Sequence, residues 1–333
     1  MGAGLTKRRF LTISAASLGV GALPLGSSAR RATYHLIEWR GLSLGAVATI
    51  RIHHSDKHAA ERTLRNVVAE ARRLEAIFSL YRADSALSEL NLRGVLLSPP
   101  PELCNLMDLC DRIWHVTGGV FDPTVQALWK CYADHFSNAA ALRGNLELEL
   151  EKALQFVGWP GVDFSRDRIV LSRRGMALTL NGIAQGYITD RVVELLRDGG
   201  IDSCLVNMGE IRTLGSPDAE AWRIALRGPT GAESATVTLD TMNEAIASSG
   251  AAGYQFDTDG RSNHLFNPAT GRCADPARTI TVVTSRAAEA DALSTAFSLM
   301  DDPAIAAVLA HIGSARVYAT MIEGTREIGG GSG

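Results

Sequence analysis

The chain has 333 residues, of which 46% are hydrophobic and 21% are charged, and its formal net charge is -3. This composition supports one large core or two ordinary ones and excludes disorder for most of the chain. The near-neutral charge excludes a broad basic surface, so we expect no nucleic-acid partner and local binding of any anion.

The first 29 residues have the composition of an export signal. Arg8 and Arg9 stand in T-K-R-R-F-L, and a run of small and apolar residues follows and ends at Ala29. The run contains glycines and a proline, which disfavour a buried helix, and it is shorter than the ~20 residues that span a membrane. We therefore expect a twin-arginine signal over residues 1–29, a periplasmic mature protein and no membrane span in that mature part.

Residues 35–39 and 46–53 have the pattern of two strands, and apolar and polar residues alternate in the second. A long amphipathic helix is expected over residues 56–78. Its apolar face comprises Leu64, Val67, Val68, Ala71, Leu74 and Phe78. Either Asp84 or Ser85 caps the start of the next helix, because both side chains can accept a hydrogen bond from its first turn.

Residues 100–155 are helical in pattern, with an interruption at T-G-G-V-F-D-P-T. Short apolar or alternating segments, which predict strands, dominate after residue 168. These segments are 169–172, 177–180, 203–207, 222–227, 235–239, 245–249 and 279–284. Helices are expected between them over 183–197 and 287–300.

Strands and helices do not alternate regularly along the chain. The pattern therefore predicts an α+β fold with mixed, largely antiparallel sheets rather than a doubly wound parallel sheet. We expect a single domain over residues 30–325 and a flexible tail over 326–333, which ends in G-G-G-S-G.

The chain has five cysteines, an odd number without C-x-x-C spacing: Cys104, Cys110, Cys131, Cys204 and Cys273. This pattern disfavours a disulfide framework or a zinc site. One bridge stays open in an oxidising compartment.

The stretch L-T-L-N-G-I-A-Q-G-Y-I-T-D, residues 178–190, predicts a strand that turns into a helix. Its turn has two glycines but neither a G-x-G-x-x-G pattern nor the lysine of a phosphate-binding loop. A nucleotide cradle of the usual kind is therefore not indicated.

Two further segments contain candidate site residues. Asp291 and Thr295 are spaced i,i+4 in A-D-A-L-S-T-A, so on a helix they offer two hard oxygens on one face to a small cation. An ordinary solvated or internally satisfied pair is the alternative for this spacing. His264 stands beside the turn N-P-A-T-G and is expected to titrate near neutrality, although a structural role for it stays open.

The order of these motifs resembles the ApbE-type family, the FAD:protein FMN transferases, over about residues 41–320. The matching blocks are Tyr81 with Asp84, Ser85 and Asn91; G-V-F-D-P-T at 119–124; Gly182-Ile183-Ala184 with Gly186, Tyr187 and Asp190; Ser249-Gly250 with His264 and P-A-T-G at 268–271; and A-D-A-L at 290–293 with Thr295 and Ala296. The export signal and the motif T-L-N-G-I-A-Q-G-Y resemble those of the NosX-type branch, which serves nitrous-oxide reductase maturation.

The resemblance implies a T-fold-like architecture with a flavin cleft between two lobes. It implies Mg²⁺-dependent transfer of FMN from FAD to a Ser or Thr of an acceptor flavoprotein, with release of AMP. A NosR-like membrane protein is the acceptor that the narrower similarity suggests. Two alternatives remain: an FAD pyrophosphatase that yields FMN and AMP, and a non-catalytic periplasmic flavin-binding or delivery protein.

Residue roles follow from the same resemblance. Asp291, Thr295 and the backbone carbonyl of Gly182 are expected to bind Mg²⁺, which prefers oxygen ligands. His264 is the expected general base, and Asp291 is the alternative. The residues expected to contact FAD are Leu44, Tyr81, Val120, Phe121, Asp122, Thr179, Gln185 and Leu265.

The chain departs from the family pattern around the strand-to-helix turn. Thr179 and Gln185 replace an acid and a lysine, and Asn181 replaces a glycine. Neutral hydrogen bonds would then replace ion pairs to the flavin nucleotide, at roughly half their strength. Glu210 stands where many relatives have a second glycine, and it either reshapes the acceptor side or faces solvent.

Overall fold

The computed structural model describes residues 34–137, 144–216, 220–226, 228–229, 237–258 and 260–329. The expected export signal, residues 1–29, lies outside the described residues. Within those ranges no helix is both long and apolar enough to cross a membrane.

The centre of the fold is an eight-stranded sheet in which every neighbouring pair is antiparallel. Its strands, in spatial order, are β1 (His35–Ser43), β2 (Ala46–His54), β6 (Cys204–Asn207), β7 (Ile211–Leu214), β10 (Ala245–Gly250), β11 (Thr279–Thr284), β12 (Arg316–Met321) and β13 (Gly324–Ile328). The expected α+β class with largely antiparallel sheets is confirmed.

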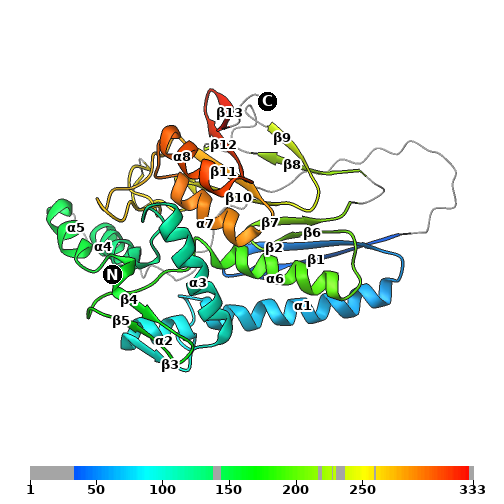
Figure 1. The fold of residues 1–333 in the computed structure, drawn as a ribbon, viewed down its shortest axis with the longest axis horizontal. Helices are drawn as coiled ribbons and strands as arrows, with labels where there is room; N and C mark the ends of the chain where they lie inside the picture. The colour runs from blue at the N-terminus through cyan, green and yellow to red at the C-terminus, as the bar shows by residue number, and fades with distance from the viewer. Residues whose placement is uncertain are drawn as a thin grey trace, which may run out of the picture.

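Three helices pack against one face of this sheet: α1 (Lys57–Phe78), α6 (Ala184–Asp198) and α7 (Ala287–Phe297) (Figure 1). The main core lies between these helices and the sheet. The opposite face packs against the hairpin of β8 (Trp222–Leu226) and β9 (Val237–Thr241), with Leu205, Ile224 and Ile246 in the contact.

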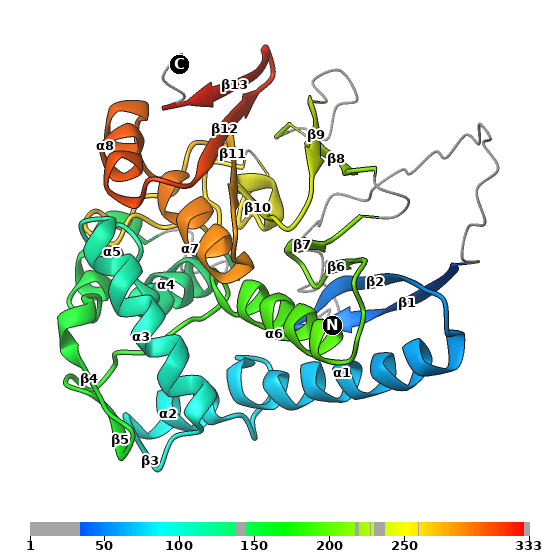
Figure 2. The ribbon, with the colours of Figure 1, turned by 45° about the vertical axis from the view of Figure 1, so that its right-hand side comes forward.

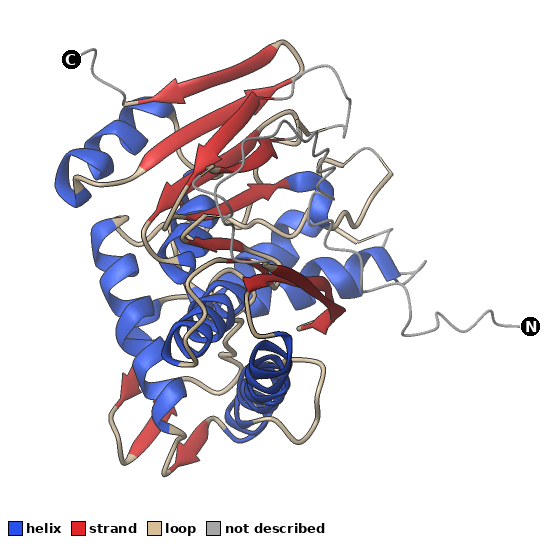
Figure 3. Cartoon of the chain, turned by 90° about the vertical axis from the view of Figure 1, so that its right-hand side faces the viewer, coloured by secondary structure: helices blue, strands red, loops and turns tan. Residues whose placement is uncertain are grey.

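A second group of elements lies along one side of the molecule and extends to the end opposite to β12 and β13 (Figures 2 and 3). Its helices are α2 (Ala86–Arg93), α3 (Pro101–Val116), α4 (Gln126–Ser137) and α5 (Leu146–Leu154). Its three-stranded sheet consists of β3 (Val95–Leu97), β5 (Arg168–Leu171) and β4 (Val162–Phe164). The last helix, α8 (Asp302–Ile312), packs beside β13.

Local capping explains where two of these helices begin. The Asp56 side chain accepts a hydrogen bond from the Ala59 N–H at 3.0 Å, at the start of α1. Of the two residues expected to cap α2, Ser85 takes the role, because its Oγ accepts from the Ser88 N–H at 3.0 Å. The Asp84 carboxylate instead pairs with Arg82.

The strand expected over residues 177–180 is wrong. The segment is extended, and its side chains alternate between buried and half-buried, which explains the strand-like pattern. Its hydrogen bonds do not go to a neighbouring strand: the Asn91 side chain bonds both the N–H and the carbonyl of Leu178, at 2.7 and 2.8 Å. The Thr179 N–H donates to the Pro123 carbonyl at 2.8 Å.

The boundaries at the C-terminal end also differ from those expected. Helix α7 ends at Phe297, before the expected Met300. Residues 326–328 belong to β13, which pairs with β12, so the expected tail from residue 326 begins too early. No strand or helix was expected from the sequence over α8, β12 and β13. All five cysteines are free in the structure.

Candidate active site

A cavity of about 950 Å³ lies where α6, α7, the end of β10 and the loop after α3 meet. Every site residue expected from the sequence except Leu44 lines it. These are Tyr81, Val120, Phe121, Asp122, Thr179, Gly182, Gln185, His264, Leu265, Asp291 and Thr295. Segments far apart in the chain therefore converge on one space.

Helices α6 and α7 approach each other closely at Gly186. A Cβ atom at this position would lie 2.3 Å from the carbonyl oxygen of Ala287, so the contact requires glycine. The Gly186 N–H donates to Oδ2 of Asp291 at 3.0 Å. Backbone contact between the helices thus fixes one oxygen of the Asp291 carboxylate.

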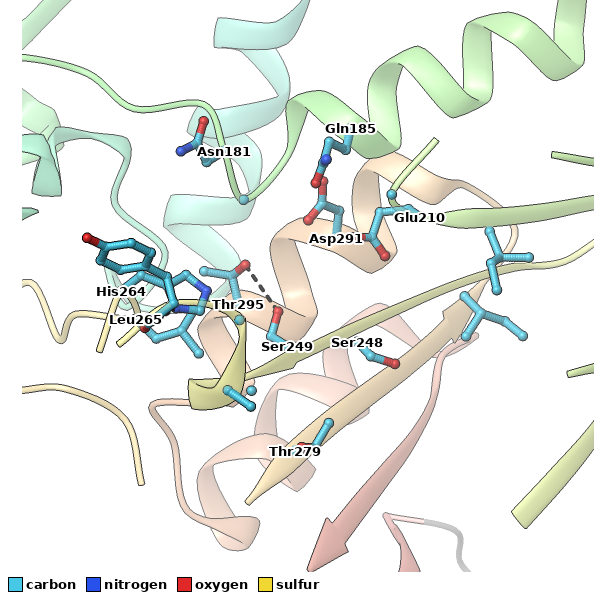
Figure 4. A pocket seen from close by; sticks show the side chains of 18 of the residues that line it. Asn181, Gln185, Glu210, Ser248, Ser249, His264, Leu265, Thr279, Asp291 and Thr295 are labelled. Atoms are coloured by element: carbon cyan, nitrogen blue, oxygen red, sulfur yellow. Dashed lines mark hydrogen bonds between the residues drawn. The ribbon is translucent and has the colours of Figure 1, made fainter. Parts of the chain in front are cut away.

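The turn before α6 lies against the next turn of α7. A Cβ atom at Gly182 would lie 2.8 Å from Oγ1 of Thr295, so the Gly182 backbone and this hydroxyl are neighbours. Thr295 follows Asp291 by one helical turn, and Figure 4 shows both side chains directed into the cavity. The structure therefore brings together the three residues expected to bind a cation.

Asp291 is only 4% exposed and forms no ion pair with any described lysine or arginine. Burial raises the pKa of its carboxyl to about 8, the Gly186 N–H lowers it, and the charge of Asp190 raises it further. Its ionised form therefore lacks a compensating positive charge within the described part of the chain.

Glu210 lies beside Asp291 in the wall of the cavity (Figure 4). Burial, and then the charge of Asp291, raise the pKa of Glu210 well above its usual range, while a hydrogen bond from the Ser248 backbone opposes this. Of the two interpretations left open by the sequence, a place beside the site fits better, because the half-buried Glu210 lines the cavity. The cavity therefore has two adjacent carboxyl groups.

Gln185 also lies beside Asp291 in Figure 4. It is 4% exposed, its amide packs on Gly209, and its Nε2 has no hydrogen-bond partner among the described residues. A buried donor without a partner costs about 1–3 kcal/mol. An acceptor oxygen on a bound molecule would remove this cost. Asn181, the third departure from the family pattern, is exposed at the rim.

His264 lies on the side of the cavity nearer Thr295 than Glu210 (Figure 4). Its Nδ1 is 3.2 Å from the Tyr254 carbonyl oxygen, which can only accept, so Nδ1 carries the proton and Nε2 has the lone pair. Burial lowers the pKa of His264 below its usual range, so the ring is neutral at neutral pH. The ring can therefore accept a proton at Nε2.

Asp122 has a different environment, although it is also buried in the cavity wall. Its carboxylate accepts from the Thr124 N–H at 2.8 Å, the Thr124 hydroxyl at 2.5 Å and the Trp159 N–H at 2.9 Å. These bonds join the loop after α3 to the segment before β4. The carboxylate holds this loop, and the neighbouring Val120 and Phe121 form the apolar wall.

Leu44, which was also expected to contact the flavin, does not line the cavity, so this contact stays a prediction. Leu44 lies in the turn between β1 and β2 with a φ of 44°, and it packs against the main core rather than lining the cavity. Its N–H donates to the Glu75 carboxylate on α1, which holds the turn against that helix. Val47, at the start of β2, lines the cavity instead.

Sequence reasoning missed several residues that line the cavity. The Ser249 hydroxyl is 2.7 Å from the Ser294 hydroxyl and 3.5 Å from that of Thr295 (Figure 4). Trp129 and Tyr254 add aromatic surface. The only indication of Ser249 in the sequence was its place in one of the blocks that match the family. No local pattern marked Trp129 or Tyr254, because they come from elements far apart in the chain.

Comparison with solved structures identifies the fold. The flavin transferase ApbE from Vibrio cholerae superposes with a TM-score of 0.74 at 22% identity, covering 89% of this chain and 97% of that chain. The ApbE protein from Thermotoga maritima gives a TM-score of 0.76 at 25% identity, covering 88% and 97%. The fold is that of the ApbE-type flavin transferases.

Sequence comparison then gives the family. The chain belongs to the ApbE family, whose model matches residues 44–319. The FAD:protein FMN transferase of Treponema pallidum is 28% identical over 306 residues, which cover 84% of this chain and 81% of that protein. The enzyme of the same name from Salmonella typhimurium is 25% identical over 299 residues, covering 85% and 84%.

Proposed function

We propose that the protein is a Mg²⁺-dependent FAD:protein FMN transferase, which moves FMN from FAD to a Ser or Thr hydroxyl of an acceptor flavoprotein and releases AMP. The observation that carries this proposal is the convergence of Asp291, Thr295 and the Gly182 turn in one cavity. The names of the curated relatives support the same activity.

The donor set fits magnesium better than zinc or iron. The described residues contain no cluster of three or more His, Cys, Asp or Glu side chains. Mg²⁺ is commonly held by one or two carboxylates together with substrate phosphates. Asp291, the Thr295 hydroxyl and the Gly182 carbonyl would hold it here, with Glu210 as a second carboxyl group nearby. When bound, Mg²⁺ would neutralise the diphosphate and the charge that builds on the departing AMP.

The remaining walls suit the flavin nucleotide. Phe121 and Leu265 are buried in the wall, and Tyr81 and Tyr254 add aromatic surface. Apolar walls with a few oriented polar groups are typical of cofactor sites. The unpartnered Nε2 of Gln185 is available to an oxygen of the nucleotide, which supports the neutral hydrogen bond expected in place of the lysine.

His264 supplies the proton acceptor in this proposal. The acceptor's hydroxyl oxygen forms a bond to the FMN phosphorus, and the bond from that phosphorus to the bridging oxygen breaks. AMP leaves with the bridging oxygen, and the hydroxyl proton passes to Nε2 of His264. The hydrogen bond from Nδ1 to Tyr254 fixes the tautomer that this transfer requires. Asp291 is less suited as the base, because its carboxylate is needed by the cation.

We propose in addition that the enzyme works in the periplasm after twin-arginine export. The paired Arg8 and Arg9 and the short apolar run that follows them support this location. The NosX-like sequence of the turn suggests that the acceptor is a NosR-like membrane protein with a periplasmic Ser or Thr.

The test incubates the purified protein with FAD, Mg²⁺ and a flavoprotein acceptor. In-gel fluorescence on the acceptor, absent from an acceptor whose target Thr is replaced by Ala and absent with a chelator, is the expected result. Free FMN and AMP without labelled acceptor would instead support FAD hydrolysis. Unchanged FAD in the presence of Mg²⁺ and a competent acceptor would contradict both reactions and support a flavin-binding protein.

A further inference from the structure

Helix α7 begins without a side-chain cap of its own. Arg286, at its N-cap position, makes no side-chain capping bond. The first two N–H groups of the helix donate instead to Asp190, which lies on α6: Ala287 to Oδ1 at 2.8 Å and Ala288 to Oδ2 at 3.1 Å. A carboxylate is a strong acceptor for the N–H groups at a helix start, which have no partner within the helix. The cap of α7 thus comes from another helix.

A second contact of the same kind, with donor and acceptor helices exchanged, lies one helical turn away. On α6, Gly186 precedes Asp190 by one turn, and its N–H donates to the Asp291 carboxylate. On α7, Ala287 precedes Asp291 by one turn. Each helix therefore donates backbone hydrogen to a carboxylate of the other, and the two contacts together fix both the rotation and the position of α7 along α6.

The charge of Asp190 is balanced in a way that the charge of Asp291 is not. Arg212 on β7 lies 2.6 Å from Oδ1 of Asp190, and Arg286 lies 3.7 Å from Oδ2. Asp190 does not line the cavity. It is therefore unsuited to bind the cation itself. Besides the effect of its charge on the pKa of Asp291, it can influence the site through the position of α7.

We infer that Asp190 is a positioning residue, which sets the register of α7 against α6 and so holds Asp291 and Thr295 where they can bind the cation. The inference rests on the proposed metal-binding role of Asp291 and Thr295. If so, replacing Asp190 should weaken metal binding more than the loss of a helix cap elsewhere in the protein does.

The test compares Asp190→Ala with Asp301→Ala. Asp301 caps α8 through a 2.9 Å bond from the Ala304 N–H, so its loss removes a helix cap without touching α7. Calorimetric titration with Mn²⁺ gives the Kd, and thermal unfolding gives the stability of each variant. We expect Asp190→Ala to raise the Kd at least about tenfold, because the loss of a residue that orients metal ligands commonly weakens metal binding by that much. Asp301→Ala should keep the wild-type Kd despite its lower Tm.

Asp190→Asn provides a second variant, because the amide keeps one acceptor oxygen for the helix start and loses the charge. We expect it to fold and to show an intermediate Kd, which keeps the test valid if the alanine variant does not fold. A wild-type Kd in Asp190→Asn and in any folded Asp190→Ala would overturn the inference while leaving the proposed function intact. Failure of the wild-type protein to bind Mn²⁺ would overturn the proposed metal site, and the inference with it.

Discussion

Asp122 and Asp291 are both aspartates buried in the wall of one cavity, 7% and 4% exposed, and they serve different purposes. Burial raises the pKa of both carboxyls. Asp122 accepts hydrogen bonds from Thr124 and Trp159, whereas Asp291 accepts one, from Gly186. The two carboxylates therefore differ in the number of their hydrogen-bond donors, although both are buried.

The two carboxylates should differ in the free-energy cost of their removal. Removing a carboxylate that satisfies several donors leaves those donors without partners in the interior. Removing one that has a single donor leaves little behind and relieves the cost of burying its charge. Stability should therefore depend on Asp122, and metal binding on Asp291.

The largest expected effect is on turnover in Asp291→Asn. The amide keeps the shape of the side chain and an acceptor for the Gly186 N–H, but it lacks the charge that attracts the cation. Metal-dependent FAD turnover should fall roughly 10³-fold, because a catalytic cation contributes several kcal/mol. Thermal unfolding without metal should be unchanged or slightly raised. Full activity in this variant, or equal activity of the wild type in chelator, would contradict the assignment.

The second effect is on stability in Asp122→Ala. Three donors from Thr124 and Trp159 lose their acceptor, so the free energy of unfolding should fall by about 3 kcal/mol. Urea unfolding measures this loss, and Mn²⁺ titration of the folded variant should give a Kd near that of the wild type. An unchanged unfolding free energy would mean that the loop after α3 does not depend on this carboxylate.

The third effect is a pH dependence that distinguishes the metal-free and metal-bound proteins. Asp291 ionises near 3.8 when exposed, but its pKa in the folded protein is raised to about 8, mainly by burial. Between these values the folded state holds more protons than the unfolded state, so stability falls as the pH rises through this window. The metal-free Tm should therefore fall more steeply in the wild type than in Asp291→Asn.

Magnesium should reverse this trend in the wild type alone. Because the cation requires the ionised carboxylate, the Mg²⁺-induced rise in Tm should be larger at pH 8 than at pH 6. Parallel pH profiles for wild type and Asp291→Asn, with and without Mg²⁺, would show that another group controls the dependence.

The sequence predicted the fold where side-chain pattern and backbone bonding agree. Helix α1 was expected within a residue of its start because its apolar face is a local pattern, and the structure adds a local cap, Asp56. Residues 177–180 have the same alternation as a strand, but the Asn91 side chain, 87 positions away from Leu178, supplies the hydrogen bonds. No local pattern reports a partner so distant.

The candidate site was also predicted only where its residues follow a local pattern or the family resemblance. The spacing of Asp291 and Thr295 placed both on one helix face, and the resemblance added the Gly182 turn, which a close backbone approach now explains. The neighbours of Asp291 across the cavity could not be predicted, because Glu210 reaches it from a different element. Leu44 does not line the cavity, because the hairpin turn packs against α1 through Glu75, a contact that depends on tertiary structure.

The proposed magnesium site can be located directly in a crystal of the protein grown with FAD and Mn²⁺, with anomalous data collected at the manganese edge. We expect one strong peak within ligand distance, about 2.0–2.3 Å, of the Asp291 carboxylate, the Thr295 hydroxyl and the Gly182 carbonyl, and beside the diphosphate. A peak elsewhere, or none at saturating Mn²⁺ in a correctly folded crystal with bound FAD, would contradict the proposed site.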